Sequence, residues 1–315
     1  MAKKATEGVY TCLKDLIRLQ YKARGFSFLP RQPMHSLLAG KHASRLRGRG
    51  LNFEELRHYL PGDDIRSMDW KATMRSGKPH VRVMTEERDR PAYIVVDQRN
   101  RMFFGSQLNL KSVTAAELGA VAAWRVLDQG DRVGTIVFND TDISEVRPQR
   151  SRRNVLKILR ELERYNNALQ PDNTVESNQN MLNVVLEQLA GIVKHDSLVC
   201  IITDMDGADA KTREITTRLA QRNDVIVGFV YDPLERDLPA AGNIVFSSHD
   251  RQLEVDTRNS KVTSAFKKGF DERMENAKRI LLQRAAPLVP VSTAENVVMQ
   301  IQQLLGYARS KRRNP

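Results

Sequence analysis

The sequence predicts an α/β protein with a doubly wound, mostly parallel sheet that is flanked by helices. In the second two thirds of the 315 residues, short β-branched runs alternate with stretches of helical periodicity. This alternation is typical of parallel strands whose crossover helices cover both faces of the sheet. The composition, 41% hydrophobic and 28% charged, fits a globular protein and excludes a mainly disordered or fibrous chain.

The predicted strands are runs of strand length that are rich in Val and Ile. The first, 92–97, ends in a carboxylate; the others are 132–138, 141–146 (by alternation), 197–203, 225–231 and 287–291. Helical spacing of apolar residues predicts the helices 111–128, 152–164, 178–192, 209–222, 258–284 and 294–309. The stretch 243–256 alternates on both sides of a polar turn and predicts a hairpin.

The first 91 residues have a different character. Residues 9–24 predict one amphipathic helix, a loop-rich stretch follows, and 79–87 alternates like a strand. We therefore expect a smaller α+β element in 1–91 and the main α/β domain in 92–315.

Positive charge is concentrated in the same region. The net charge is +12, and residues 1–91 contain nineteen Lys and Arg against ten Asp and Glu. The densest part is 41–50 (KHASRLRGRG), which indicates either an anionic partner or a solvated loop. Because no aromatic residues are interleaved for base stacking, binding of single-stranded nucleic acid is the weaker interpretation.

Sequence motifs exclude several classes of protein. The 2 cysteines give no disulfide framework, and we find neither a membrane span nor a signal peptide, so we expect a cytoplasmic protein. The loop 105–112 (GSQLNLKS) lacks the second glycine of a phosphate-binding loop. Zinc-ligand spacing and a nucleophile elbow are also missing, so the sequence favours a protein that is not an enzyme.

One constellation of polar residues remains at the predicted sheet edge. Asp97 and Asp204 follow strands, and Thr174 lies on a third loop. Carboxylates and hydroxyls could hold a hard cation such as Mg²⁺ or Mn²⁺ there. The alternative is that the aspartates cap the helices or turns that follow them.

A second acidic group lies in the first 91 residues. Asp63, Asp64 and Asp69 could hold a cation in a metal-dependent enzyme. Because basic residues are interspersed among them, an ion-pair network is favoured. We expect this network to be a structural brace that ties the N-terminal element to the sheet, with Trp70 as its buried anchor.

The segment 48–90 contains the most specific pattern in the chain. It holds Gly48-Arg49-Gly50, then a run of spaced residues: Phe53, Leu56, Arg57, Tyr59, Pro61, Gly62, Asp63, Asp64, Arg66, Asp69 and Trp70. This pattern resembles the signature of the domain of unknown function 58 family, whose members are von Willebrand factor A-like and MoxR-associated. The resemblance continues through Asp97, Phe104-Gly105, Lys111, Gly130–Gly134 and Asp232-Pro233-x-Glu235.

The resemblance implies a von Willebrand factor A-like domain, whose metal-ion-dependent adhesion site uses Asp-x-Ser-x-Ser. Here Asp97 and Asp204 match the two aspartates and Thr174 loosely matches the threonine, but Arg99 and Arg101 replace both serines. A guanidinium beside Asp97 could supply the charge that a metal ion would bring. We therefore expect a degenerate adhesion site that binds metal weakly or not at all, and no other cofactor.

The resemblance also implies a function. Members of this bacterial family look like partners of MoxR-type AAA+ ATPases, and of other von Willebrand factor A proteins, in chaperone-like assembly or activation of complexes or in stress tolerance. We expect a non-enzymatic interaction module that uses the strand-end face around Asp97, Arg99, Arg101 and Asp204, or the basic segment 41–50. The alternative is a nucleic-acid-binding protein that uses 41–50.

Overall fold

The chain forms two compact units. One comprises Met1–Pro30 and Arg90–Pro315, and we call it the larger unit; the small unit is Arg31–Asp89. The computed structural model describes residues 8–23, 51–86, 90–171, 177–239, 242–248, 251–282 and 286–305.

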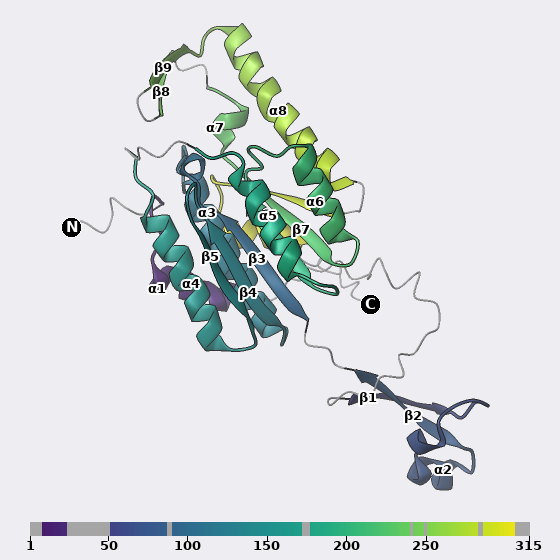
Figure 1. Ribbon diagram of the computed structural model, residues 1–315. Coiled ribbons are helices and arrows are strands. Elements are labelled where there is room, and N and C mark those ends of the chain that lie inside the picture. The colour runs from purple at the N-terminus through teal and green to yellow at the C-terminus, as the bar shows by residue number, and fades with distance from the viewer. Residues whose placement is uncertain are drawn as a thin grey trace, which may run out of the picture. The chain divides into compact units, whose positions relative to one another are not determined.

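The larger unit is built on a six-stranded sheet (Figure 1). Its strands, in the order β10-β7-β6-β3-β4-β5 across the sheet, are β10 (Leu288–Ser292), β7 (Asp224–Tyr231), β6 (Leu198–Thr203), β3 (Pro91–Asp97), β4 (Arg132–Phe138) and β5 (Ile143–Gln149). Every neighbouring pair is parallel except β4 and β5. The topology confirms the predicted α/β fold of von Willebrand factor A type. The strand order reverses between β3 and β6, which is where doubly wound sheets place their ligand sites.

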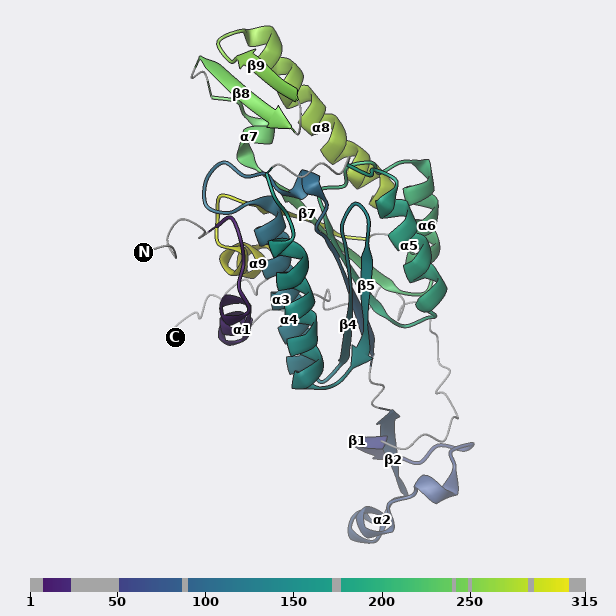
Figure 2. The same ribbon diagram turned by 60° about the vertical axis from the view of Figure 1, so that its left-hand side comes forward.

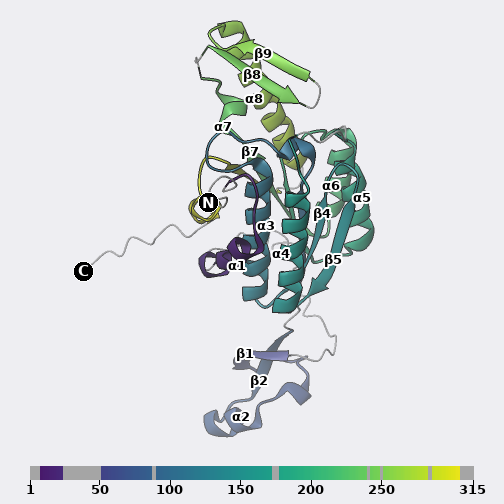
Figure 3. The same cartoon turned by 90° about the vertical axis from the view of Figure 1, so that its left-hand side faces the viewer.

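Two layers of helices cover the sheet (Figures 2 and 3). One layer contains α1 (Leu13–Lys22), α3 (Lys111–Asp128), α4 (Arg152–Asn167) and α9 (Val297–Leu305); the other contains α5 (Met181–Ile192), α6 (Ala210–Ala220) and α8 (Ser260–Leu282). Successive side chains of a strand point to opposite faces, so Ile94 packs in the first layer and Val95 in the second. None of the described helices is both long and apolar enough to cross a membrane.

Helix α1 belongs to the larger unit, although the sequence grouped it with the first 91 residues. Leu16 is fully buried, and its carbonyl accepts a hydrogen bond of 3.1 Å from Trp124 Nε1 of α3. The backbone N–H of Thr11 donates to Asn166 Oδ1 of α4 at 2.8 Å. The apolar side of this amphipathic helix is therefore covered by α3 and α4.

A protruding segment follows β7. It contains the short helix α7 (Pro233–Arg236) and a hairpin of β8 (Asn243–Ser248) and β9 (Arg251–Asp256), which confirms the hairpin predicted at 243–256. The hairpin forms a two-stranded sheet of its own beside the beginning of α8, beyond the carboxyl ends of the parallel strands (Figures 1 and 3).

Both outer strands of the six-stranded sheet contain a proline. Pro148 lies in β5, and Pro290 lies in the middle of β10. Beside Pro290, the Gln300 side chain of α9 accepts from the Ser292 N–H and donates to the Ser292 carbonyl, both at 2.8 Å. Gly134 lies where β4 meets the irregular part of β5, and a Cβ there would come within 2.6 Å of the Val146 carbonyl oxygen.

The small unit contains a hairpin of β1 (Leu51–His58) and β2 (His80–Glu86), joined through the 3-10 turn η1 (Ile65–Ser67) and helix α2 (Trp70–Ser76). The sequence predicted the second strand and missed β1 and α2. The pairing of β1 shifts between Phe53 and Glu55, which interrupts the alternation that marks a strand. Helix α2, with 7 residues, is too short to show helical periodicity.

We expect Leu16→Ala to lower the free energy of unfolding by about 2–5 kcal/mol, because it leaves a cavity between α1 and α3. Tyr21→Ala on the same helix should change it by less than about 0.5 kcal/mol, because Tyr21 is 75% exposed. Urea denaturation followed by circular dichroism measures both. Equal stabilities of the two variants would show that α1 does not pack on the larger unit as described.

Candidate functional site

The candidate site lies where the strand order of the sheet reverses. Asp97 is the last residue of β3, and Asp204 directly follows β6, the neighbouring strand. Both side chains are completely buried. The two parallel strands end side by side, so the sheet itself brings the two carboxylates to one place, as the sequence predicted.

Arg99 supplies the cation for Asp97. Its Nη2 lies 2.7 Å from Asp97 Oδ2, its Nε 3.0 Å from Oδ1, and its backbone N–H also donates to Oδ1 at 3.0 Å. Thr203 Oγ1, at the end of β6, donates to Asp97 Oδ2 at 2.7 Å. The same Nη2 lies 3.9 Å from Asp204 Oδ1. The guanidinium thus faces both aspartates.

Lys111 supplies the cation for Asp204. It is the first residue of α3, and its Nζ lies 2.8 Å from Asp204 Oδ2 and 2.9 Å from Glu235 Oε1 of α7. Glu235 Oε2 in turn lies 3.2 Å from Arg273 of α8. We call the continuous set of ion pairs the buried ion network; its members are Asp97, Arg99, Asp204, Lys111, Glu235 and Arg273.

The network keeps its groups charged despite burial. Burial raises the pKa of Asp204, but Lys111 and Arg99 outweigh it and hold that pKa below its ordinary value. Burial lowers the pKa of Lys111, and the nearby Asp204 and Glu235 more than offset it, so the Lys111 pKa is raised. The pKa of Arg99 is also raised, because the Asp97 carboxylate outweighs the effect of burial. Each buried charge therefore depends on an opposite charge at close range.

Arg101 is the accessible member of the predicted site. Its side chain is 45% exposed, and its Nε lies 3.2 Å from Asp206 Oδ2. Thr174 and the basic segment 41–50 lie outside the described residues.

The acidic residues of the family signature make local contacts within the small unit. Arg57 forms a two-pronged pair with Asp63 at 2.8 and 2.6 Å, and Asp69 pairs with Arg82 at 2.7 Å. Ion pairs of this kind were predicted there. Three further signature residues shape turns: the Tyr59 N–H donates to the Pro79 carbonyl, Gly62 takes a positive φ of 104°, and Asp64 accepts from the Arg66 N–H.

The prediction that Trp70 is a buried anchor is wrong, because its side chain is 61% exposed. Asp69 caps α2 by accepting from the Ala72 N–H at 2.9 Å. The helix is further attached through Thr73, whose Oγ1 accepts from the His80 N–H of β2. Trp70, the first residue of this helix, faces solvent although the helix is attached through Asp69 and Thr73.

Sequence reasoning gave no role to several residues of the buried ion network. Lys111 and Glu235 were part of the family resemblance, but they lie 93 and 31 positions from Asp204, so nothing local joined them to it. Their presence in the signature was the signal that could have found them. Thr203 and Arg273 carried no comparable signal.

Comparison of the sequence with models of protein families shows which family the chain belongs to. The family model described as "Protein of unknown function DUF58" matches residues 55–276, more than half of the chain. The chain belongs to the DUF58 family.

The individual relatives of this DUF58 protein have low sequence identity to it. It is 25% identical over 300 residues to "Uncharacterized protein Rv1480" of Mycobacterium tuberculosis (strain ATCC 25618 / H37Rv) and to "Uncharacterized protein Mb1516" of Mycobacterium bovis. Each of these alignments covers 94% of this chain and 90% of the relative. Among solved structures, it is similar to the conserved hypothetical protein BatB from Bacteroides thetaiotaomicron. That match has a TM-score of 0.39 and 14% identity, and it covers 68% of this chain and 98% of BatB.

The residues at the strand ends do not fit the divalent cation that an adhesion site implies. A cation needs free carboxylate oxygens, but both oxygens of Asp97 bind Arg99, and Asp204 Oδ2 binds Lys111. In the described part of the chain, no group of three or more His, Cys, Asp or Glu side chains is arranged to hold a metal ion. Arg99 and Lys111 provide the positive charge at this position.

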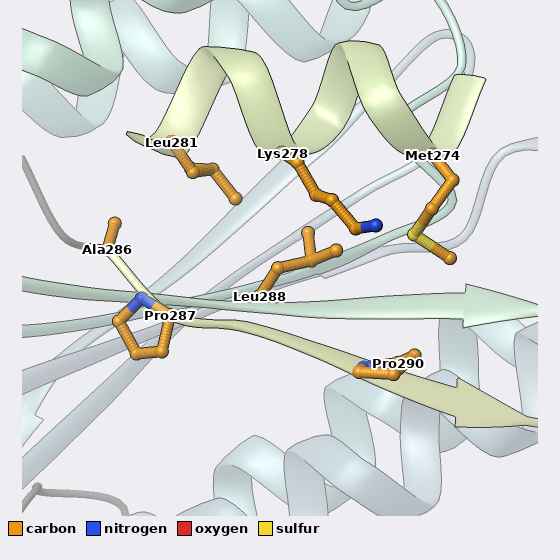
Figure 4. A pocket seen from close by; sticks show the side chains of 7 residues that line it. All are labelled: Met274, Lys278, Leu281, Ala286, Pro287, Leu288 and Pro290. Atoms are coloured by element: carbon orange, nitrogen blue, oxygen red, sulfur yellow. The ribbon is translucent and has the colours of Figure 1, made fainter. Parts of the chain in front are cut away.

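An apolar groove of about 500 Å³ lies elsewhere on this DUF58 protein, between the last turns of α8 and β10 (Figure 4). Its apolar lining includes Met274, Leu281, Leu288 and Pro290. Of the described residues that line it, only Lys278 is titratable, and its Nζ pairs with Glu275 at 2.6 Å. The groove therefore offers shape and apolar surface, with one cation that is already paired.

We expect Lys111→Met to lower the free energy of unfolding by about 3–5 kcal/mol at neutral pH, because it leaves Asp204 and Glu235 buried without their cation. Lys268→Met is the control, because the Lys268 side chain is 78% exposed. Chemical denaturation measures both variants.

The pH dependence of that loss tests its cause. The pKa of Asp204 is lowered in the folded protein, so its ion pairs stabilise the fold above the ordinary aspartate pKa and lose this effect as the pH falls. The difference between wild type and Lys111→Met should therefore shrink below about pH 4. A difference that is constant with pH would mean that lost packing, and not the unpaired carboxylates, causes the destabilisation.

We expect calorimetric titration of the wild-type protein with Mg²⁺ or Mn²⁺ to show no tight binding, because Arg99 and Lys111 already bind the carboxylates. The same titration of Arg99→Ser, in which the guanidinium is removed, shows whether the cation competes with Arg99. Tight binding by the wild type that Asp97→Ala abolishes would contradict the interpretation of the site.

Proposed function

We propose that this DUF58 protein is a non-enzymatic protein-interaction module that serves as an adaptor of a MoxR-type AAA+ ATPase. In this role it would link the ATPase to protein complexes that the ATPase assembles or activates. Two kinds of evidence support the proposal: membership of the family whose signature suggested such a partner, and the chemistry of the strand-end site.

The buried ion network is the observation that carries the proposal. Asp97, Asp204 and Lys111, the groups that could act as bases or nucleophiles, are at most 1% exposed. Each one is held by an opposite charge within 3 Å. A general base or nucleophile has to reach a substrate in a reactive protonation state. The network is better suited to fixing the position of loops than to chemistry.

The network fixes several chain segments at one end of the sheet. Arg99 holds the loop after β3, and its Nη2 also donates to the Asp206 carbonyl at 3.2 Å in the loop after β6. Lys111 joins the beginning of α3 to α7 through Glu235. These contacts fix the segments relative to one another, and a surface that is formed before a partner arrives costs less entropy to bind.

Direct contact with a partner at this face must come from its accessible residues. Asp97, Arg99 and Asp204 are too deeply buried to touch another protein. Arg101, whose side chain is 45% exposed, can do so. The net charge of +12 favours a partner with an acidic surface, because complementary charge accelerates and orients association.

The decisive measurement is calorimetric titration with the MoxR-type ATPase encoded in the same genome. Both proteins are purified, treated with nuclease and mixed at an ionic strength of about 0.15 M, with ATP, with ADP and without nucleotide. We expect saturable binding whose affinity depends on the nucleotide. In parallel, the tagged protein is used to capture partners from its native host.

Absence of ATPase binding in all three nucleotide conditions would contradict the proposal. If the tagged protein captured only nucleic acid before nuclease treatment, and held it at physiological salt, nucleic-acid binding would become the leading interpretation.

A further inference from the structure

The small unit exposes an unusual amount of apolar surface. Of the eleven large hydrophobic side chains exposed in the described part of the chain, five belong to this unit: Leu56, Leu60, Ile65, Trp70 and Met74. Among its described side chains, Val81 is the one buried hydrophobic residue. A two-stranded hairpin gains little stability from its own packing. Its exposed apolar side chains are therefore available for contact with another surface.

Helix α2 concentrates this apolar surface on one side. Trp70 and Met74, four positions apart, are 61% and 83% exposed. Lys71 and Arg75, also exposed, lie next to them around the helix. At 3.6 residues per turn these four residues span an arc of about 140°. We call Trp70, Lys71, Met74 and Arg75 the α2 face.

The α2 face is cationic as well as apolar. Within the described residues, Lys71 and Arg75 have no ion-pair partner, whereas the nearby Asp63 and Asp69 are committed to Arg57 and Arg82. The carboxylates of Asp63 and Asp69 thus do not neutralise this side of the helix. Tryptophan, methionine and arginine are also the residue types that are enriched in protein–protein interfaces.

We propose that the α2 face is a docking surface for an acidic protein surface that contains an apolar pocket, with Trp70 as the inserted anchor. The proposal rests on the proposed function, and it assigns this contact to the ATPase partner. It adds a second contact surface, in a different unit from Arg101.

Charge and size argue for this occupant over others. A second copy of the chain would bring Lys71 and Arg75 against themselves, and the chain's own basic segment 41–50 would repel the face in the same way. An anionic membrane would match the charge, but a helix of 7 residues with two exposed apolar side chains inserts little apolar area into a bilayer. An acidic protein surface with a pocket satisfies both the cations and the indole.

The experiment uses ¹⁹F NMR of the full chain labelled with 5-fluorotryptophan. The chain has 2 tryptophans, so it gives two resonances, and Trp70→Phe assigns them. Trp124 is 2% exposed and serves as the internal reference. In the free protein, we expect the Trp70 resonance to shift between H₂O and D₂O and the Trp124 resonance to stay. Addition of the unlabelled ATPase should then shift or broaden the Trp70 resonance and remove its solvent isotope effect.

Variants measure how much the face contributes to affinity. Trp70→Ala and Met74→Ala should each weaken ATPase binding by about tenfold or more in calorimetry. Met299→Ala is the matched control, because Met299 is 61% exposed on α9. Arg75→Glu should weaken binding and reduce its dependence on salt, whereas Lys261→Glu, also at an exposed position, should not. Circular dichroism melts verify that each variant is folded.

The outcomes separate this proposal from the function on which it rests. If the wild-type protein does not bind the ATPase, the proposed function fails and the docking surface fails with it. If the ATPase binds equally to wild type, Trp70→Ala and Met74→Ala, only the docking surface is contradicted. It is also contradicted if Trp70 shows no solvent isotope shift in the free protein, which means that the chain itself covers this side chain. A Trp70 response to vesicles of phosphatidylglycerol and phosphatidylcholine, without a response to the ATPase, would assign the face to membranes.

Discussion

Two buried cations neutralise two buried carboxylates at the carboxyl ends of β3 and β6, and the arrangement of the candidate site depends on this neutralisation. Asp97 and Asp204 are brought together by the sheet and would repel each other there without Arg99 and Lys111. Arg99 comes from the loop after β3, and Lys111 comes from the beginning of α3. Lys111 also binds Glu235 of α7, and Glu235 binds Arg273 of α8. The ion pairs that neutralise the two aspartates therefore also connect this end of the sheet to α7 and α8. At these strand ends, the positive charge beside the two aspartates therefore comes from side chains that the fold holds in place.

The two units use similar ion pairs for different purposes. In the small unit the pairs join residues that are close in sequence: Arg57 with Asp63, and Asp69 with Arg82. Such pairs close turns and set the direction of a short helix. In the buried ion network, Lys111 reaches Asp204 across 93 positions of the chain. Pairs of that range connect separate elements, so they bear on how the elements are arranged and less on which elements form.

This difference explains how much could be predicted from the sequence. The predicted helix 111–128 and strand 132–138 agree with the structure at both ends, because burial on all sides leaves a clear apolar pattern. The convergence of Asp97 and Asp204 followed from their places at predicted strand ends, and the arginine beside Asp97 was expected from the resemblance to the adhesion-site motif. The role of Lys111 could not be predicted in this way, because it depends on contacts between distant elements. Trp70 was misplaced for another reason. An aromatic residue in a signature suggests a core, but Trp70 begins a short helix and is 61% exposed.

The prolines in the outer strands restrict how the protein can associate. A sheet can gain a strand from a neighbouring molecule only where its outer strand has free backbone N–H and carbonyl groups. Pro148 and Pro290 lack the N–H, and at β10 Gln300 occupies both backbone groups of Ser292. At the β10 margin, the main sheet is thereby protected from joining the sheet of another chain, which is the usual beginning of β-rich aggregates. Recognition of another protein at that margin is then left to side chains, which discriminate between surfaces, because backbone groups pair with any strand.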